Sequence, residues 1–193
     1  MAVRALEKPL PKPRRDPVGY ASARVLEALL EGILALEFLK RGYTRNAAGK
    51  AFQAWRALVA ALLALEKPAL DRLVEDEKSR RRLEETGIPR VPTARLKPLS
   101  RLLEQAGYRY IRSHTDKALD LHDYQLHGPD PDLELSKYPG EEEARQDILY
   151  ILSILLDIIE DRAKPGLEEA RAWSSEHEQA LRQLRENLQQ QQA

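Results

Sequence analysis

Residues 44–66 read TRNAAGKAFQAWRALVAALLALE. Large apolar residues recur here every three or four positions, which is the period of an α-helix with one buried face. The opposite face begins polar and becomes a ridge of small side chains, against which a second helix can pack closely. We therefore expect a central helix whose C-terminal half is buried on both sides. The apolar stripe contains Ala51, Trp55, Leu58, Val59 and Leu62, and the opposite face contains Asn46, Lys50, Gln53, Ala57, Ala60 and Ala64.

Helical periodicity continues on both sides of this stretch. We expect helices over residues 18–42, 107–127 and 141–163, and a last helix separated from them by Pro165 and Gly166. Strict alternation of apolar and polar residues, the pattern typical of strands, is absent. The sequence thus predicts an all-α protein, an up-and-down bundle of four to five helices.

The remaining segments divide the chain into parts. Residues 1–16 are rich in basic residues and proline and are expected to form a flexible basic arm. Residues 17–163 form the bundle, interrupted at 68–106 by a charged, proline-containing insert with short helices. Residues 164–193 form a C-terminal helix with a frayed, glutamine-rich end.

Composition narrows the class of protein. The length of 193 residues fits one domain, and the absence of cysteine excludes disulfides, cysteine zinc sites and thiol nucleophiles. The longest apolar stretch, residues 148–159, is broken by Ser153 and Asp157 and falls short of the roughly 20 residues that span a bilayer. No glycine-rich phosphate loop and no His-Glu-x-x-His motif occurs. We expect a cytoplasmic protein with no membrane partner, no metal and no cofactor.

The formal net charge of zero is a cancellation between two parts of the chain. Residues 1–127 carry 24 Lys and Arg against 16 Asp and Glu, whereas residues 128–193 carry 7 against 15. One interpretation is that the two parts pack against each other, in one domain or across a dimer. The other is a basic surface that meets phosphate, which would make binding depend on salt. Its cations would come from the arm and from Lys40, Arg41, Arg45, Arg80, Arg81, Arg82, Arg90 and Arg95.

Three of the four histidines lie within residues 108–131. His122 falls in the middle of the apolar stripe of its helix, so we expect it to face inward. A buried neutral histidine, hydrogen-bonded to a neighbouring helix, is one interpretation, and a working site residue is the other. The stripe, counted from Tyr108, contains Tyr108, Ile111, Thr115, Ala118, Leu119 and Leu126.

Two arginines precede these histidines. Arg109 and His114 are five residues apart and point in different directions on a straight helix, so they meet only if the helix bends or a partner chain contributes. Arg112 and Asp116 are four residues apart, the spacing of a surface ion pair on a helix.

Two segments of the sequence resemble a known protein family. Residues 44–66, quoted above, and KALDLHDYQLHGPDPDLELSKY at residues 117–138, followed by a strongly apolar helix, resemble the archaeal PaREP family of small helical proteins. That family is similar to a branch of the HEPN (higher eukaryote and prokaryote nucleotide-binding) superfamily. The resemblance implies an up-and-down helical bundle that commonly forms a homodimer, and the wide apolar stripe of residues 148–159 favours the same expectation.

The resemblance implies two functions. Many HEPN proteins are metal-independent ribonucleases with an Arg-x4-6-His motif, in which the arginine binds phosphate and the histidine assists attack by the ribose hydroxyl. Here only Arg109 and His114 have that spacing, and Arg112 lies ten residues before His122. Other members are noncatalytic modules that bind nucleotides or partner proteins.

We therefore expect a noncatalytic or degenerate homodimer that binds a nucleotide, RNA or a partner protein. The alternative is a metal-independent endoribonuclease that uses Arg109 or Arg112 with His114 or His122. The candidate binding residues are Lys50, Tyr124, Arg80, Arg81 and Arg82.

Overall fold

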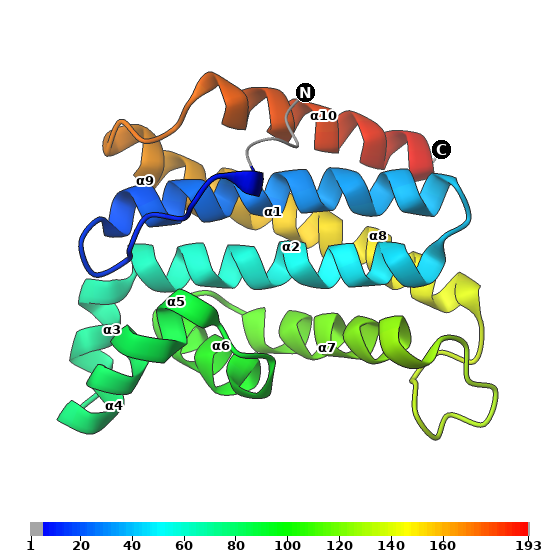
Figure 1. The fold of residues 1–193 in the computed structure, drawn as a ribbon, viewed down its shortest axis with the longest axis horizontal. Helices are drawn as coiled ribbons and strands as arrows, with labels where there is room; N and C mark the ends of the chain where they lie inside the picture. Colours follow the sequence, from blue (N-terminus) through cyan, green and yellow to red (C-terminus); the bar gives the residue numbers. More distant parts are fainter. Residues whose placement is uncertain (1–5, 193) are drawn as a thin grey trace.

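The structure, a computed structural model, describes residues 6–192, and this range holds helices and turns but no strand. The all-α class is confirmed. Figure 1 shows α1, α2 and α7 side by side, with α8 behind them and α10 along the top, against α1. The five long helices are α1 (Pro17–Lys40), α2 (Thr44–Leu65), α7 (Ile111–His127), α8 (Glu141–Ile158) and α10 (Ser175–Gln192).

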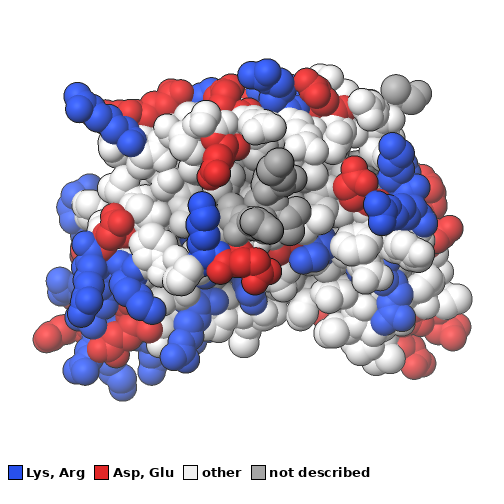
Figure 2. Space-filling view, turned by 45° about the horizontal axis from the view of Figure 1, so that its top comes forward, with Lys and Arg blue, Asp and Glu red and all other residues white. Residues whose placement is uncertain are grey.

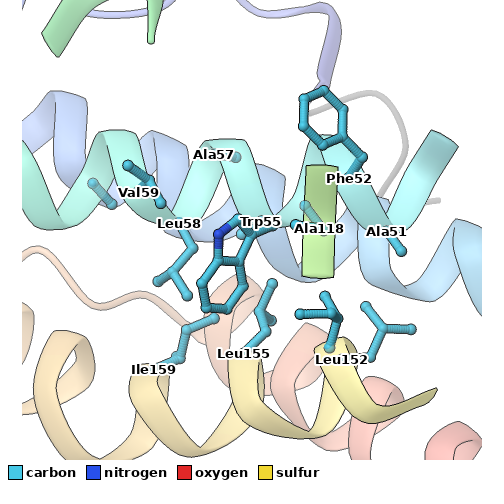
Figure 3. Packing of buried hydrophobic residues seen from close by; sticks show 14 of the residues in the cluster. Ala51, Phe52, Trp55, Ala57, Leu58, Val59, Ala118, Leu152, Leu155 and Ile159 are labelled. Atoms are coloured by element: carbon cyan, nitrogen blue, oxygen red, sulfur yellow. The ribbon is translucent and has the colours of Figure 1, made fainter. Parts of the chain in front are cut away.

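Helix α2 is the centre of the bundle, as its sequence predicts. Every residue of its apolar stripe is fully buried. In Figure 3 the Trp55 ring extends from α2 toward α8 and lies near Leu155 and Ile159. The indole N–H donates to Thr115 Oγ1 of α7 at 3.0 Å, so one side chain links α2 to both neighbours. Thr44 is the first residue of this helix.

The predicted alanine ridge of α2 lies in the interior, where α2 packs along α1 and against the insert. Ala57, Ala60 and Ala64 are all buried, and α2 packs against two helices of the insert, α5 and α6. By length and composition α2 is apolar enough to cross a membrane, but 78% of its most apolar window is buried inside the molecule, as in the core helix of a soluble protein. A cytoplasmic location stays a prediction.

The insert is a chain of short helical turns. Its elements are α3 (Lys67–Leu73), α4 (Glu77–Arg82), the π-turn η2 (Leu83–Gly87), α5 (Ile88–Arg90), the 3-10 turn η3 (Thr93–Arg95) and α6 (Leu96–Gln105). Figure 1 places α3 and α4 beside the end of α2, away from the long helices. The insert therefore extends one end of the bundle as well as covering α2.

The expected break at Pro165 and Gly166 is wrong. Helix α8 continues through the π-turn η4 (Ile159–Ala163) into α9 (Lys164–Glu169), and the chain leaves the helix only after Glu169. A π-turn shifts the hydrogen bond to the residue five positions back, and Lys164 N–H donates to the Ile159 carbonyl. Pro165 follows directly at the start of α9, where its missing N–H is tolerated. The π-turn η2 precedes Pro89 in the same way.

Helix α7 begins four residues later than expected. Tyr110 adopts a left-handed conformation with a φ of 62°, and the helix starts at Ile111. At its other end Arg45 of α2 donates to the carbonyls of Gln125 and Leu126, at 2.7–3.2 Å. These bonds satisfy carbonyls that the helix end leaves free and join α2 to the end of α7.

The N-terminal segment lies against α1. Residues 6–16 run along this helix, and Leu6 packs on the core. Asp16 caps α1 by accepting a hydrogen bond from the Gly19 N–H at 2.8 Å. Residues 1–5 of the predicted arm lie outside the described residues, and the flexibility of the arm stays a prediction.

Helix α10 is held to α1 by a buried histidine and a row of leucines. The His177 Nε2–H donates to the Ser22 carbonyl of α1 at 2.8 Å, and Nδ1 accepts from the Ser174 hydroxyl at 2.8 Å. Only a neutral imidazole can donate from one ring nitrogen and accept at the other. Burial lowers the pKa of His177, which favours this neutral form. Leu181, Leu184 and Leu188 continue the contact.

Acid is expected to destabilise the protein through His177. Because the folded state lowers the pKa of this histidine below its ordinary 6.5, the unfolded chain binds the proton more strongly. The free energy of unfolding should stay constant above pH 6.5 and fall as the pH drops below 6.5. Urea denaturation between about pH 7.5 and about pH 5 measures this loss.

His177→Gln is the control, because glutamine does not titrate. The variant should be less stable at neutral pH but lose less stability on acidification, whereas an unchanged pH dependence would contradict the assignment. The other buried contributor is His114, whose pKa is also lowered by burial and which remains in both proteins.

Candidate functional site

A surface groove runs between α7 and α8. It consists of two neighbouring pockets of about 500 and 320 Å³ that share Lys117 and Asp147. The first pocket is lined by Tyr110, Ser113, His114, Lys117, Asp147 and Tyr150. The second is lined by Lys117, Asp120, Lys137, Tyr138, Glu143, Gln146 and Asp147. We call the two together the α7–α8 groove.

His114 is the titratable centre of the first pocket. Its Nδ1 lies 3.1 Å from the Tyr150 hydroxyl of α8, and its ring meets the edge of Trp55 in the core, with centroids 6.1 Å apart. Partial burial lowers the pKa of His114, so the imidazole is neutral near pH 7. A neutral imidazole with one bonded nitrogen can accept a proton or bind a polar ligand.

A partly buried carboxylate network lies next to this histidine. Lys117 pairs with Asp147 at 2.9 Å, and the Tyr138 hydroxyl donates to the same carboxylate at 2.8 Å. Burial and this carboxylate raise the pKa of Tyr138, which therefore stays protonated. Burial also raises the pKa of Asp120. The floor of the groove is thus fixed by hydrogen bonds, and most of the Lys117 charge is neutralised.

Two tyrosine rings are exposed at the first pocket. Tyr110 is 62% exposed and Tyr150 is 43% exposed. The left-handed backbone at Tyr110 is unusual for an aromatic residue, and such conformations are enriched at functional sites. The Arg109 guanidinium lies 5.6 Å from the centre of the Tyr110 ring. The pocket therefore offers aromatic faces with a cation close by.

The two candidate arginines are absent from the lining of the pocket at His114. Arg109 lies on the turn before α7, and neither Arg109 nor Arg112 lines the pocket at His114. The expected ion pair between Arg112 and Asp116 is replaced by one from Lys97 of α6 to Asp116 at 2.9 Å. Helix α6 packs along α7, so the carboxylate meets a closer partner.

His122 lies outside the groove. Its ring stacks on Phe52 of α2, with centroids 4.3 Å apart, and Nδ1 is buried without a hydrogen-bond partner in the described part of the chain. The expected hydrogen bond to a neighbouring helix is therefore wrong. The stripe was predicted by counting helical angles from Tyr108, which precedes the left-handed turn. It therefore included Leu126, which is exposed, and missed Leu121, which is buried.

The other predicted binding residues are engaged within the protein. Tyr124 is 1% exposed and packs edge-on against Tyr138, so it belongs to the core and presents no surface to a ligand. Lys50 pairs with Glu31 of α1 at 2.8 Å. In α4, Arg81 pairs with Glu85 at 2.9 Å, and Arg80 donates to the Glu75 carbonyl at 3.0 Å. Arg82 is exposed on the same helix.

Sequence reasoning missed most of the groove. Tyr150 and Asp147 follow His114 by more than thirty residues, and nothing local connects the two segments. One signal was present, because Tyr150 is the single aromatic residue in an otherwise aliphatic stretch. Within residues 6–192 no group of three or more histidine and acidic side chains is arranged to hold a metal ion.

The fold and the groove define a class: a small all-helical protein with an aromatic, polar groove between two antiparallel helices. A family model described as the archaeal PaREP1/PaREP8 family matches residues 23–149, and the chain belongs to that family. The match spans most of α1 through the first half of α8 and so includes most of the groove. No curated protein and no solved structure matches the chain.

Proposed function

We propose that this protein is a noncatalytic, HEPN-like homodimeric module that binds a nucleotide or single-stranded RNA in the α7–α8 groove. The observation that carries the proposal is the exposure of two tyrosine rings, Tyr110 and Tyr150, at the pocket that contains His114. Aromatic faces stack on bases of any sequence, and such stacking is a main source of affinity for single strands.

Cations near the rings suit the phosphates of such a ligand. Arg109 lies over Tyr110, and Arg112 is exposed in the first turn of α7. Neither has a carboxylate partner within residues 6–192, so their charges are available to a phosphate. Lys117 adds little, because Asp147 holds it.

The absence of an arginine from the pocket lining favours a noncatalytic module. A ribonuclease of the Arg/His type needs both side chains on one phosphate, and His114 is accompanied here by Tyr150 instead. One observation supports the alternative enzyme: a neutral histidine bonded to a hydroxyl is suited to act as a general base. Cleavage of RNA in the presence of EDTA, abolished by His114→Ala at unchanged thermal stability, would establish that alternative.

Homodimer formation rests on the outward side of α8. Ile154 and Ile158 are only partly buried there. A second copy packed on this side would cover the apolar surface and bring two grooves close together. Light scattering at micromolar concentration should give the mass of a dimer, and a monomer would contradict this part of the proposal.

Tyr110→Ala is expected to weaken ligand binding by about tenfold, the loss of one stacking contact. Fluorescence anisotropy of labelled oligouridine and of a labelled adenine nucleotide measures the effect. Tyr43→Ala is a matched control, because Tyr43 is also an exposed tyrosine, 57% accessible, and lies at the start of α2 away from the groove. Equal affinities of the two variants would refute binding at the groove.

A further inference from the structure

A second cleft lies where the insert meets the end of the bundle. Its inner part is a pocket of about 560 Å³ between the start of α1, the end of α2 and the insert. None of its residues belongs to the α7–α8 groove. Its walls are mainly apolar and include Pro17, Val18, Ala64, Leu65, Pro68 and Ile88. The volume and the apolar lining are typical of pockets that hold small molecules.

The outer part of this cleft is charged. A neighbouring pocket of about 690 Å³ shares Arg14 and Glu84 with the first, so the two pockets adjoin. Its other lining residues are Glu77, Arg80, Arg81 and Glu85. In Figure 2 Lys and Arg side chains gather with acidic ones at the left end, where Figure 1 places α3 and α4. The cleft thus passes from an apolar interior to a charged mouth.

The ion pairs at the mouth determine which charged side chains remain free to contact a ligand. Lys67 pairs with Glu84 at 2.7 Å and with Asp71, and Arg81 pairs with Glu85. The acidic side chains nearest the inner pocket are therefore neutralised by neighbours.

Two arginines at the mouth have no carboxylate partner within residues 6–192. These are Arg14, which lines both pockets, and Arg80, which bonds to a backbone carbonyl. A guanidinium group binds carboxylate and phosphate through two parallel hydrogen bonds.

We propose that this cleft binds an amphiphilic anion, a molecule with an apolar chain and a terminal carboxylate or phosphate. The chain lies against Val18, Ala64 and Ile88, and the anionic group meets Arg14 and Arg80. A neutral or cationic amphiphile would leave the arginines unpaired. The site is independent of the α7–α8 groove.

Binding of four ligands with one common chain tests the proposal: decanoate, decyl phosphate, decanol and decyltrimethylammonium. Isothermal titration calorimetry with the full chain, below micelle-forming concentrations, should show saturable binding of at least one anion. Decanol and the cation should bind at least about tenfold more weakly, since a charge-assisted hydrogen bond is lost. The tighter of the two anions identifies the head group. Equal binding of decanol, or no saturable binding of either anion, overturns the proposal.

Paired variants locate the site. Arg14→Gln should weaken anion binding by about tenfold, whereas Arg15→Gln, the exposed neighbour that lines neither pocket, should not. Arg80→Gln and Arg82→Gln form a second pair in α4. Equal effects within both pairs would overturn the assignment. Tyr110→Ala should bind the anion like the unmodified protein, which separates this site from the proposed function.

Discussion

Trp55→Ala is expected to lower the free energy of unfolding by about 4 kcal/mol, near the upper range for single core substitutions. The side chain is fully buried and is among the largest in the core. Its loss opens a cavity between α2 and α8, where Leu155 and Ile159 lie close to the ring (Figure 3). It also removes the donor to Thr115, whose hydroxyl lies 2.6 Å from that of Ser100.

Trp173→Ala is the natural control, because the chain has two tryptophans. Trp173 is only partly buried, over Lys164 and beside His177, and its removal leaves no closed cavity. We expect its cost to be below about half that of Trp55→Ala. Urea denaturation followed by circular dichroism compares the two. Equal losses would contradict the central position assigned to Trp55.

Leu184→Ala is expected to cost about 3 kcal/mol of unfolding free energy. Leu184 is fully buried, and its methyl groups lie only 3.1 and 3.2 Å from where a Cβ would stand on Gly32 of α1. The glycine lets α10 approach α1 closely, and the leucine fills the space. Truncating it leaves a void in a contact too tight to close by small shifts.

Gln183→Ala, one residue earlier on the exposed side of α10, should change the stability by less than about 0.5 kcal/mol. Chemical denaturation compares the two variants, and hydrogen exchange of α10 amides shows whether the helix opens by itself. If Leu184→Ala cost no more than the control, α10 would be a detachable cover and not part of the core.

The centre of the fold could be predicted because its information is local. The stripe from Ala51 to Leu62 and the alanine ridge each follow from helical periodicity within one segment. Both were confirmed, because the stripe and the alanines of the ridge are buried, and both α1 and the insert pack on α2.

Departures from regular helix could not be predicted in this way. Because the backbone at Tyr110 is left-handed, α7 starts later than expected and the residues before Tyr110 do not continue its helical angles. Counting the stripe from Tyr108 therefore placed Leu126 wrongly inside. The π-turns before Pro89 and Pro165 place both prolines at helix starts, and a break was expected at Pro165. These are properties of backbone geometry that side-chain periodicity does not encode.

The candidate site depended on contacts between distant segments. The sequence indicated His114 as a titratable residue in a cluster. Its contact with Tyr150 and the ion pair between Lys117 and Asp147 form only when α8 packs beside α7. Tyr124, by contrast, was a candidate binding residue and is buried against Tyr138.

The hydrogen bonds from Arg45 to the end of α7 affect how the salt dependence of nucleic-acid binding by this protein should be interpreted. When a protein binds a nucleic acid, the slope of affinity against salt concentration counts the counterions that its cations release from phosphates. Arg45 already donates to two carbonyls at a helix end that carries partial negative charge. It joins two helices whether or not a ligand is present, so it releases no counterion on binding. The slope will therefore be shallower than the excess of basic residues in the first 127 positions suggests.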